Sequence, residues 1–361
     1  MNRIYNFSAG PAILPVPVLE QASRDILEIG NSGMSILEVS HRSKEYEAVH
    51  FAAMENVLKT LGLSPETWTV LFLGGGASLQ FTMVPMNFLS DGQTADYIDS
   101  GSWSSKAIKE AKRYGTVHIA GSSAGTNYNR LPDPLSFSPS PRYVHITTNN
   151  TIFGTQYFDL PETNGIPLVA DMSSDIFSVE RDWSRFGLLY AGAQKNAGPA
   201  GVTVVVAQKA FLEQAKADLP PMLSYQTQAE NDSLYNTPPV FGIHMLNLVL
   251  QWIAEQGGMR AIEQRNRAKA QTIYDVLDQY PEIYEPAVVQ KADRSLMNLT
   301  WRLVDREREK EFLATAQARR MDGLKGHRSV GGFRASIYNA FPPAGCEALA
   351  TLLHDWAHGK A

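Results

Sequence analysis

The stretch Leu188–Gly201 constrains the fold of this chain more than any other segment. An apolar, strand-like run leads to Lys195, small residues and glycines surround that lysine, and a second apolar strand begins at Val202. A lysine between two buried strands has room beside its amine for a flat group. Burial also lowers the pKa of an amine, so that it can attack a carbonyl carbon. A solvated lysine in a tight turn has the same local pattern.

An aspartate upstream favours the buried lysine. Residues 166–171 form an apolar run that ends in Asp171, and open α/β sheets bind ligands at the carboxyl ends of their strands. A strand-end aspartate and a strand-end lysine together suit pyridoxal phosphate. The lysine forms a Schiff base with the cofactor, and the aspartate keeps the pyridine nitrogen protonated, so that the ring withdraws electrons. Asp171 could instead cap a helix, as could the serines that follow it.

Charge and cysteine content exclude several classes of protein. The chain has 361 residues and a formal net charge of −5, with its basic residues scattered, so we expect no nucleic-acid partner. A single cysteine, Cys346, cannot form an internal disulfide, which is typical of a reducing compartment. The N-terminus lacks a signal-peptide core, and no apolar run is long enough to span a bilayer. We therefore expect a cytoplasmic protein with no membrane partner.

Small or polar residues recur where the expected strands end. Residues 74–78 are glycine-rich and precede a helical pattern, so their N–H groups could bind an anion, although a plain tight turn has the same composition. Trp103 follows the strand expected over 94–99 and could stack on a flat ring or pack under the next helix. The strand expected over 143–151 ends in hydroxyl and amide groups. This recurrence predicts one ligand site at the carboxyl edge of the sheet.

Residues after about 268 form a separate pattern. A strand is expected over 296–303, a helix over 307–321 and a final helix over 346–358, which together indicate an α+β module. The glycine-rich segment 323–337 lies between the two helices. Its basic side chains could capture a carboxylate or phosphate, or could be solvated charges. Those side chains are His327, Arg328 and Arg334.

The positions of prolines and glycines set the expected organisation. Three early prolines make residues 1–15 an extended arm, which we expect to pack with the small domain. A large, mainly parallel-sheet α/β/α domain is expected over 16–265 and a smaller α+β domain over 266–361. The remaining helices are expected over 18–29, 44–61, 209–218, 241–254 and 259–280, with a surface loop over 121–142.

With these segments assembled, the chain resembles the phosphoserine aminotransferases, a family of fold-type I pyridoxal-phosphate enzymes, from end to end. The lysine stretch and the histidine–arginine pairs are specific to that branch, whereas the aspartate–lysine arrangement marks only the wider superfamily. The segments that carry the resemblance are Asn6-Phe-Ser-Ala-Gly-Pro, Ser40-His-Arg-Ser, Phe72-Leu-Gly-Gly-Gly, Gly101-Ser-Trp, Ala170-Asp-Met-Ser-Ser, Tyr190-Ala-Gly-Ala-Gln-Lys-Asn-Ala-Gly-Pro-Ala-Gly, Asn236-Thr-Pro-Pro, Gly326-His-Arg and Gly332-Phe-Arg-Ala-Ser.

The resemblance implies how the cofactor is bound. Lys195 would carry the Schiff base and later move the proton between the substrate Cα and the cofactor, and Asp171 would hold the pyridine nitrogen. Trp103 would stack on the ring, and Thr151 would contact the side of the ring that bears the hydroxyl. The cofactor phosphate would be bound by Gly76, Ala77 and Gln194, and by Asn236 and Thr237 of the neighbouring subunit of a homodimer.

The resemblance also implies the substrates. L-Glutamate would give its amino group to the cofactor, and 3-phosphohydroxypyruvate would then accept it and leave as O-phosphoserine. The family often accepts a phosphorylated hydroxythreonine precursor of vitamin B6 as well. Arg334 would hold the α-carboxylate of each substrate. The distal phosphate, or the γ-carboxylate of glutamate, would be bound by His41, Arg42, His327 and Arg328.

Two positions depart from the family pattern. Many members carry an arginine directly after the glycine triplet, where this chain has Ala77, so one cation near the anion is missing. Some members have a small polar residue where this chain has Ala9. Backbone N–H groups can still bind an anion beside Ala77, but the affinity for a phosphorylated ligand is expected to differ.

Three other functions share parts of this pattern. An alanine–glyoxylate aminotransferase would not need two histidine–arginine pairs. A cysteine desulfurase needs a mobile cysteine nucleophile, and Cys346 lies at the start of the terminal helix. A non-catalytic binding protein of the same fold would be expected to lack the lysine or the aspartate, and both are present.

Overall fold

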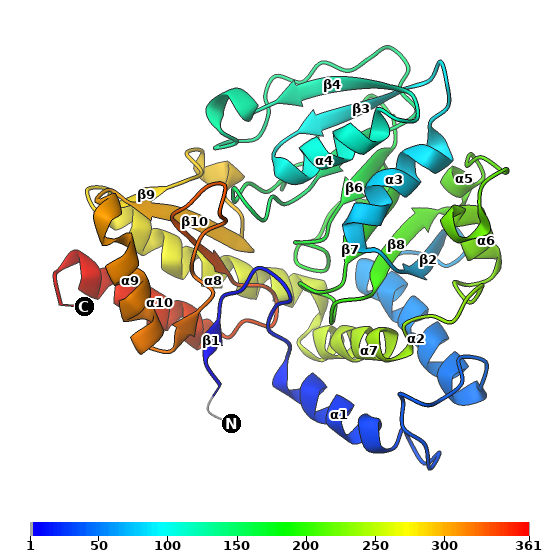
Figure 1. Ribbon diagram of the computed structural model, residues 1–361, viewed down its shortest axis with the longest axis horizontal. Coiled ribbons are helices and arrows are strands. Elements are labelled where there is room, and N and C mark those ends of the chain that lie inside the picture. The colour runs from blue at the N-terminus through cyan, green and yellow to red at the C-terminus, as the bar shows by residue number, and fades with distance from the viewer. Residues whose placement is uncertain (1–2, 361) are drawn as a thin grey trace.

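The computed structural model of the protein describes residues 3–360, and its largest element is a seven-stranded sheet (Figure 1). The sheet order is β2-β8-β7-β6-β5-β3-β4. Its strands are β2 (Trp68–Leu73), β3 (Thr94–Asp99), β4 (Thr116–Ser122), β5 (Val144–Thr147), β6 (Leu168–Asp171), β7 (Phe186–Gly192) and β8 (Thr203–Gln208). All neighbouring strands are parallel except β8, which runs antiparallel to β2 and β7. The predicted α/β fold with a mainly parallel sheet is confirmed.

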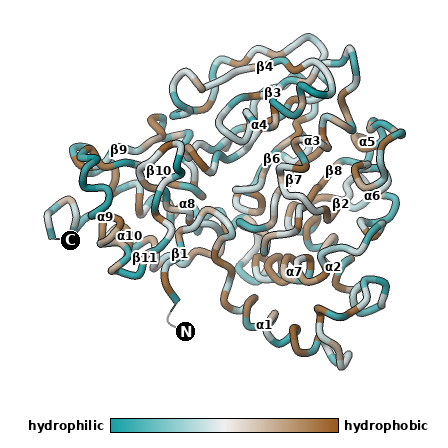
Figure 2. The backbone as a smooth tube through the Cα atoms, viewed as in Figure 1, coloured by the Kyte–Doolittle hydropathy of each residue, from teal (hydrophilic) through white to brown (hydrophobic). Residues whose placement is uncertain are grey.

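Helices cover both faces of this sheet because its strands are apolar on both faces. Along β2, Val70 and Phe72 belong to one core, and Leu71 and Leu73 belong to the other. Helices α2 and α7 contribute to the first core, and α3 and α4 to the second. Hydrophobic residues are concentrated along α7 (Figure 2). The helices are α1 (Val16–Leu27), α2 (Lys44–Leu61), α3 (Gly76–Phe88), α4 (Ser102–Ala111), α5 (Lys209–Leu212), α6 (Tyr225–Glu230), α7 (Val240–Glu255) and α8 (Gly258–Gln279).

The C-terminal part of the chain builds a smaller α+β layer. A three-stranded antiparallel sheet has the order β12-β10-β9 and packs with α9, α10 and the second half of α8. The N-terminal arm joins this part, because β1 pairs in parallel with β11 and Phe7 lies in the same core. These elements are β1 (Tyr5–Asn6), β9 (Tyr284–Pro286), β10 (Asn298–Leu303), β11 (Met321–Asp322), β12 (Phe333–Ser336), α9 (Glu309–Ala318) and α10 (Pro343–Ala357).

One expected helix is shorter in the structure, and one strand of the structure was not expected. The helix expected over 209–218 is only the short α5, because Phe211 and Leu212 are its only fully buried side chains and the prolines at 220 and 221 follow soon after. The segment 116–122 was not expected as a strand, and it forms β4. That strand lies at the sheet edge and is largely exposed, so it lacks the apolar run that marks the central strands.

Among residues 3–360, none of the helices combines the length and the apolar character needed to cross a bilayer. The long helix α8 instead connects the two layers. Met259 and Ile262 near its start lie in a core of the large sheet, whereas Ala270 and Ile273 lie in the core of the small sheet.

A buried lysine on α8 fixes the turn that follows β12. Lys269 is 2% exposed, and its Nζ donates hydrogen bonds to the carbonyls of Ile337 (2.9 Å), Tyr338 (2.7 Å) and Phe341 (3.3 Å). An ammonium has three donors, and these three carbonyls satisfy all of them. Tyr338 lies in this turn, and its hydroxyl donates to the Ala9 carbonyl at 2.8 Å. This hydrogen bond holds the N-terminal arm against the small sheet.

We therefore expect the substitution Lys269→Met to destabilise the protein. The methionine side chain fills the same space but leaves three buried carbonyls without a donor, which costs about 3 kcal/mol of unfolding free energy. Urea unfolding of the full chain measures this loss. The matched control is Lys310→Met on the exposed face of α9, which we expect to change stability by less than about 0.5 kcal/mol. Equal effects of the two substitutions would contradict this role of Lys269.

Candidate active site

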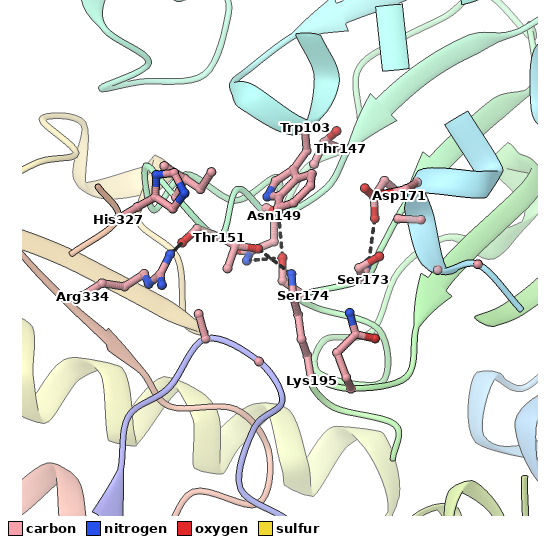
Figure 3. Close-up of a pocket in the computed structure, with 18 residues that line it drawn as sticks. Trp103, Thr147, Asn149, Thr151, Asp171, Ser173, Ser174, Lys195, His327 and Arg334 are labelled. Atoms are coloured by element: carbon pink, nitrogen blue, oxygen red, sulfur yellow. Dashed lines mark hydrogen bonds between the residues drawn. The ribbon is translucent and has the colours of Figure 1, made fainter. Parts of the chain in front are cut away.

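A cavity of about 420 Å³ opens at the carboxyl ends of β5, β6 and β7 (Figure 3). Parallel strands bring their carboxyl ends to one edge of the sheet, so segments that are distant in sequence meet there. The N-terminal arm and the small sheet close the cavity from the other side. The predicted site residues that line it are Gly76, Ala77, Trp103, Thr151, Asp171, Gln194, Lys195, His327 and Arg334.

Lys195 lies in the turn between β7 and β8. The strand β7 ends at Gly192, so the lysine belongs to the turn and not to the strand-like run expected from the sequence. Its Nζ donates a hydrogen bond to Thr151 Oγ1 at 2.7 Å. Burial lowers the pKa of this amine to about 8, and the carboxylates of Asp171 and Asp175 oppose that shift. Roughly a tenth of the amine is therefore neutral at pH 7, far more than for a lysine of ordinary pKa.

Asp171 is the last residue of β6 and is 4% exposed. Its Oδ1 accepts a hydrogen bond from the Ser173 N–H at 2.9 Å. Burial raises the pKa of the carboxyl, while the hydrogen bonds from Ser173 and the charge of Lys195 oppose that shift. A buried carboxylate whose negative charge is only partly balanced by neighbouring groups is a strong partner for a cationic ring nitrogen.

Trp103 presents its ring to the same space. It lies in the first turn of α4, which begins directly after β3, and the Lys195 Nζ is 6.0 Å from its ring centroid. Its indole Nε1 is buried and has no hydrogen-bond partner among residues 3–360. In Figure 3, the tryptophan lies above the lysine, with Asp171 on one side and Arg334 on the other.

The N-terminus of α3 forms one end of the cavity. Gly75 and Gly76 have φ angles of +80° and +61°, and a Cβ on Gly76 would meet no atom within 4 Å. These glycines let the chain turn sharply from β2 into the helix, whose first N–H groups have no partner within the helix. An anion such as a phosphate is favoured at this position by those donors and by the helix dipole.

Basic side chains form the opposite end. Arg334 on β12 donates through Nη1 to the Thr151 carbonyl at 3.1 Å, and its buried Nε has no partner among the described residues. His327 also lines the cavity, and its Nδ1 lies 2.7 Å from Ser329 Oγ. Burial lowers the pKa of His327, and the charges of Arg334 and Arg328 lower it further. Arg328 itself is exposed and does not line the cavity.

Besides Arg328, four further predicted site residues lie outside this cavity. His41 and Thr237 contact each other, with 3.5 Å between the His41 Nδ1 and the Thr237 Oγ1, whereas Arg42 and Asn236 are exposed nearby in sequence. The chain therefore gathers these four residues at a second position on its surface, apart from the lysine and the aspartate.

Several lining residues were absent from the predicted set. Thr147 is the last residue of β5 and Asn149 follows that strand, and Ser173 and Ser174 follow Asp171. The sequence had already indicated polar residues at the ends of both strands. The structure adds that Ser173 Oγ accepts from the Gly192 N–H at 3.1 Å, which ties the turn after β6 to the end of β7.

Comparisons with known proteins identify the family of the chain. The sequence model of the family "Aminotransferase class-V" matches residues 4–349, so the chain belongs to the class-V aminotransferase family. Proteins named phosphoserine aminotransferase from Geobacillus kaustophilus and Lysinibacillus sphaericus are 52% and 54% identical to it, over 99% and 98% of both chains. Within the class, the chain accordingly belongs with the phosphoserine aminotransferases.

Solved structures of that family have the same fold. The phosphoserine aminotransferase from Bacillus circulans subsp. alkalophilus is 49% identical and superposes with a TM-score of 0.96 over the whole of both chains. A phosphoserine aminotransferase from Trichomonas vaginalis, described as bound to pyridoxal phosphate, is 37% identical and superposes with a TM-score of 0.92 over 98% of this chain and all of that one.

Close packing around Gly101 gives a test of the site. A Cβ on this glycine would lie 1.6 Å from Asn150 Nδ2, and that amide donates to the Ser100 carbonyl at 2.6 Å, next to Thr151. We expect Gly101→Ala to displace the loop that carries Thr151, to cost about 2 kcal/mol of stability and to lower activity. Urea unfolding and steady-state rates measure both effects.

The control for this substitution is Gly125→Ala, because a Cβ on Gly125 would meet no atom within 4 Å. We expect that variant to behave as the wild type. A wild-type rate and stability for Gly101→Ala would contradict the packing described here.

Proposed function

We propose that this chain is a phosphoserine aminotransferase, which transfers the amino group of L-glutamate to 3-phosphohydroxypyruvate and yields O-phospho-L-serine and 2-oxoglutarate in serine biosynthesis. The observation that carries the proposal is an identity of 50% or more, over nearly the whole length of both chains, to relatives of that name. The cavity supplies what the reaction needs, because an amine of lowered pKa and a buried carboxylate face the same space.

The residues present fit pyridoxal phosphate. The Asp171 carboxylate would hold the protonated ring nitrogen, and Trp103 would pack on the ring. The indole N–H has no hydrogen-bond partner within residues 3–360, and there is open space beside Gly76 at the N-terminus of α3. The phosphate would be bound by the N–H groups of Gly76 and Ala77 and by Gln194. When bound, the cofactor supplies an electron sink for the charge that develops at the substrate Cα.

Lys195 is the proton carrier in this proposal. Its amine is partly neutral near physiological pH, so Nζ can accept the proton from the substrate Cα and return it elsewhere. Thr151 Oγ1 holds the amine at 2.7 Å and so limits its positions. The Thr151 hydroxyl would also contact the ring hydroxyl side of the cofactor.

Arg334 would bind the α-carboxylate common to both substrates. One of its nitrogens is used by the Thr151 carbonyl, and the unpaired Nε leaves part of the guanidinium edge available. His327 and Arg328 would bind the distal anion, which is a phosphate in one substrate and a γ-carboxylate in the other. The same cations would thus serve both half-reactions.

Four of the site residues outside the cavity, His41, Arg42, Asn236 and Thr237, favour a homodimer. Asn236 and Thr237 would reach the cofactor phosphate of the partner copy. Because His41 contacts Thr237, the pair His41 and Arg42 would enter the same neighbouring site and bind the distal anion there. Each site would then combine Arg334 and His327 of one copy with these surface residues of the other.

Other parts of the proposal concern organisation and setting. The domain limits are an arm over 1–15, a large domain over 16–265 and a small domain over 266–361, with the protein in the cytoplasm. A second reaction on 4-phosphohydroxythreonine, in pyridoxine biosynthesis, would use the same phosphate-binding residues.

A desulfurase activity has less support, because Cys346 is 1% exposed and lies in the core of the small sheet, away from the cavity.

Replacing the lysine tests the chemistry. We expect purified wild type with pyridoxal phosphate to absorb near ~400 nm and to lose that band when glutamate is added. Lys195→Ala removes the proton carrier and should lower kcat by at least about 10⁴-fold, without the band near 400 nm. Stopped-flow absorbance and a coupled 2-oxoglutarate assay measure the two effects. Transamination by this variant at a rate near that of the wild type would remove Lys195 from its proposed role.

The acceptor preference tests the substrate class. With glutamate as donor, we compare kcat/KM for 3-phosphohydroxypyruvate and for hydroxypyruvate, which lacks the phosphate. A site with cations placed for a distal anion should prefer the phosphorylated acceptor by about 10³-fold or more. The control variant Lys310→Met should keep that ratio. A ratio near one would mean that the basic residues are wrongly assigned and would favour a transaminase of small acids.

A further inference from the structure

A short turn of the small layer contacts the segments that carry Lys195 and Asp171. This turn, residues 337–341, directly follows β12, the strand of Arg334, and has no part in the chemistry described above. The Lys269 ammonium holds it in one geometry through three of its carbonyl groups. A fixed segment that meets three site residues from distant parts of the chain is placed to set their relative positions.

Asn339 lies in this turn and is 2% exposed. Its N–H donates a hydrogen bond to Asn196 Oδ1 at 2.9 Å, and its Nδ2 donates to the Phe177 carbonyl at 2.8 Å. Its Oδ1 accepts a hydrogen bond from Asn266 Nδ2 on α8 at 2.8 Å. One buried residue therefore connects the turn to three other segments of the chain, and its side-chain amide is used at both ends.

The contact with Asn196 reaches the lysine, because Asn196 directly follows Lys195 in the turn between β7 and β8. Asn196 is 5% exposed, and its Nδ2 donates to the Met297 Sδ at 3.6 Å. Met297 belongs to the core of the small layer, so both ends of the Asn196 amide are bonded to that layer. The position of Lys195 therefore depends on the small layer as well as on its own sheet.

The contact with Phe177 reaches the aspartate, because Phe177 lies in the segment that follows Asp171. Phe177 is fully buried and has a φ of +59°. A bulky residue rarely adopts this left-handed region, so surrounding contacts must hold it there. The hydrogen bond from Asn339 Nδ2 is one of these contacts. The segment after Asp171 is thus fixed against the same residue as the lysine turn.

We propose that Asn196 and Asn339 are positioning residues, which hold the Lys195 amine at the distance from Arg334 that proton transfer requires. A substrate whose carboxylate is bound by Arg334 then presents its Cα to an amine that the turn after the same strand has placed. The Cα proton moves to Nζ, and the electron pair of that C–H bond is delocalised into the bound cofactor. This inference rests on the proposed roles of Lys195 and Arg334.

The first test replaces Asn196 by leucine, which is similar in size but cannot accept the hydrogen bond from the Asn339 N–H. Pyridoxal phosphate is added to the cofactor-free chain, and the growth of the absorbance near ~400 nm gives the rate of Schiff-base formation. This rate reports the position of the Lys195 amine before any substrate is present. We expect Asn196→Leu to lower it by about 10-fold, because a displaced amine meets the carbonyl less often in the reactive geometry.

The second test follows the glutamate half-reaction of the loaded enzyme by stopped-flow absorbance. The maximal rate of bleaching and the half-saturating glutamate concentration are measured with ordinary glutamate and with glutamate deuterated at Cα. For Asn196→Leu we expect a maximal rate about 10-fold below wild type and a half-saturating concentration within about 2-fold of it. The isotope ratio should be at least as large as in the wild type. A displaced proton acceptor slows proton transfer, whereas Arg334 still binds the carboxylate.

Two further variants separate positioning from stability. Asn339→Leu removes both side-chain contacts of the turn, should slow the same two steps, and carries the test if Asn196→Leu fails to fold. Asn247→Leu is the matched control, because Asn247 on α7 is also 5% exposed and lies outside the cavity. Its Oδ1 accepts a hydrogen bond from Asn56 Nδ2 at 2.8 Å, so this variant should lower Tm without changing either rate.

A lower Tm with unchanged rates in Asn196→Leu and Asn339→Leu would show that the two amides are only structural and would overturn the proposal. A slower glutamate step with an isotope ratio close to one would also overturn it, because a step other than proton transfer would then be affected. Failure of the proposed function would appear in the wild type itself, as the absence of the absorbance near ~400 nm or of its bleaching by glutamate.

Discussion

The reversal of the chain between β7 and β8 is the constraint on which the site depends. Strand β7 runs parallel to β6, and β8 returns antiparallel beside it, so the turn between them lies at the edge where β6 also ends. Lys195 is in that turn and Asp171 is the last residue of β6. If β7 were followed by a helix and then by another parallel strand, the chain would leave the sheet at the same edge. The residues at that edge would then be the first turn of a helix. The tight return instead leaves a short, small-residue turn with one amine.

Polar contacts then bring the small sheet to this edge. The Asn149 amide nitrogen donates to Asn298 Oδ1 on β10 at 2.8 Å, and the Asn149 Oδ1 accepts from Ser295 Oγ at 2.6 Å. Strand β10 pairs with β12, which carries Arg334, and Arg334 donates to the Thr151 carbonyl. The loop after β5 therefore holds the lysine on one side and the arginine on the other. This explains why residues from opposite ends of the chain line one cavity.

The sequence predicted the parts of this arrangement that depend on local pattern. Asp171 and Lys195 follow long apolar runs, and Gly76 lies between an apolar run and a helical pattern, so each could be placed at a strand end. The contact of Asn149 with Asn298 spans 149 residues, and no local pattern reports such a contact. The pairing of His41 with Thr237 was missed for the same reason, since 196 residues separate them. The edge strand β4 was missed because half-exposed residues give no apolar run.

The distribution of charge gives a physical reason why one chain would not be sufficient. Within a single copy, the cavity has a helix N-terminus at one end and Arg334 with His327 at the other, while Ala77 stands where the family resemblance led us to expect an arginine. A ligand with a phosphate on the cofactor and a second anion on the substrate carries more negative charge than these groups balance. A further cation and further donors, Arg42, Asn236 and Thr237, lie together with His41 outside this cavity. A partner copy that contributes them would supply the missing positive charge, so that the site would become complete only on assembly.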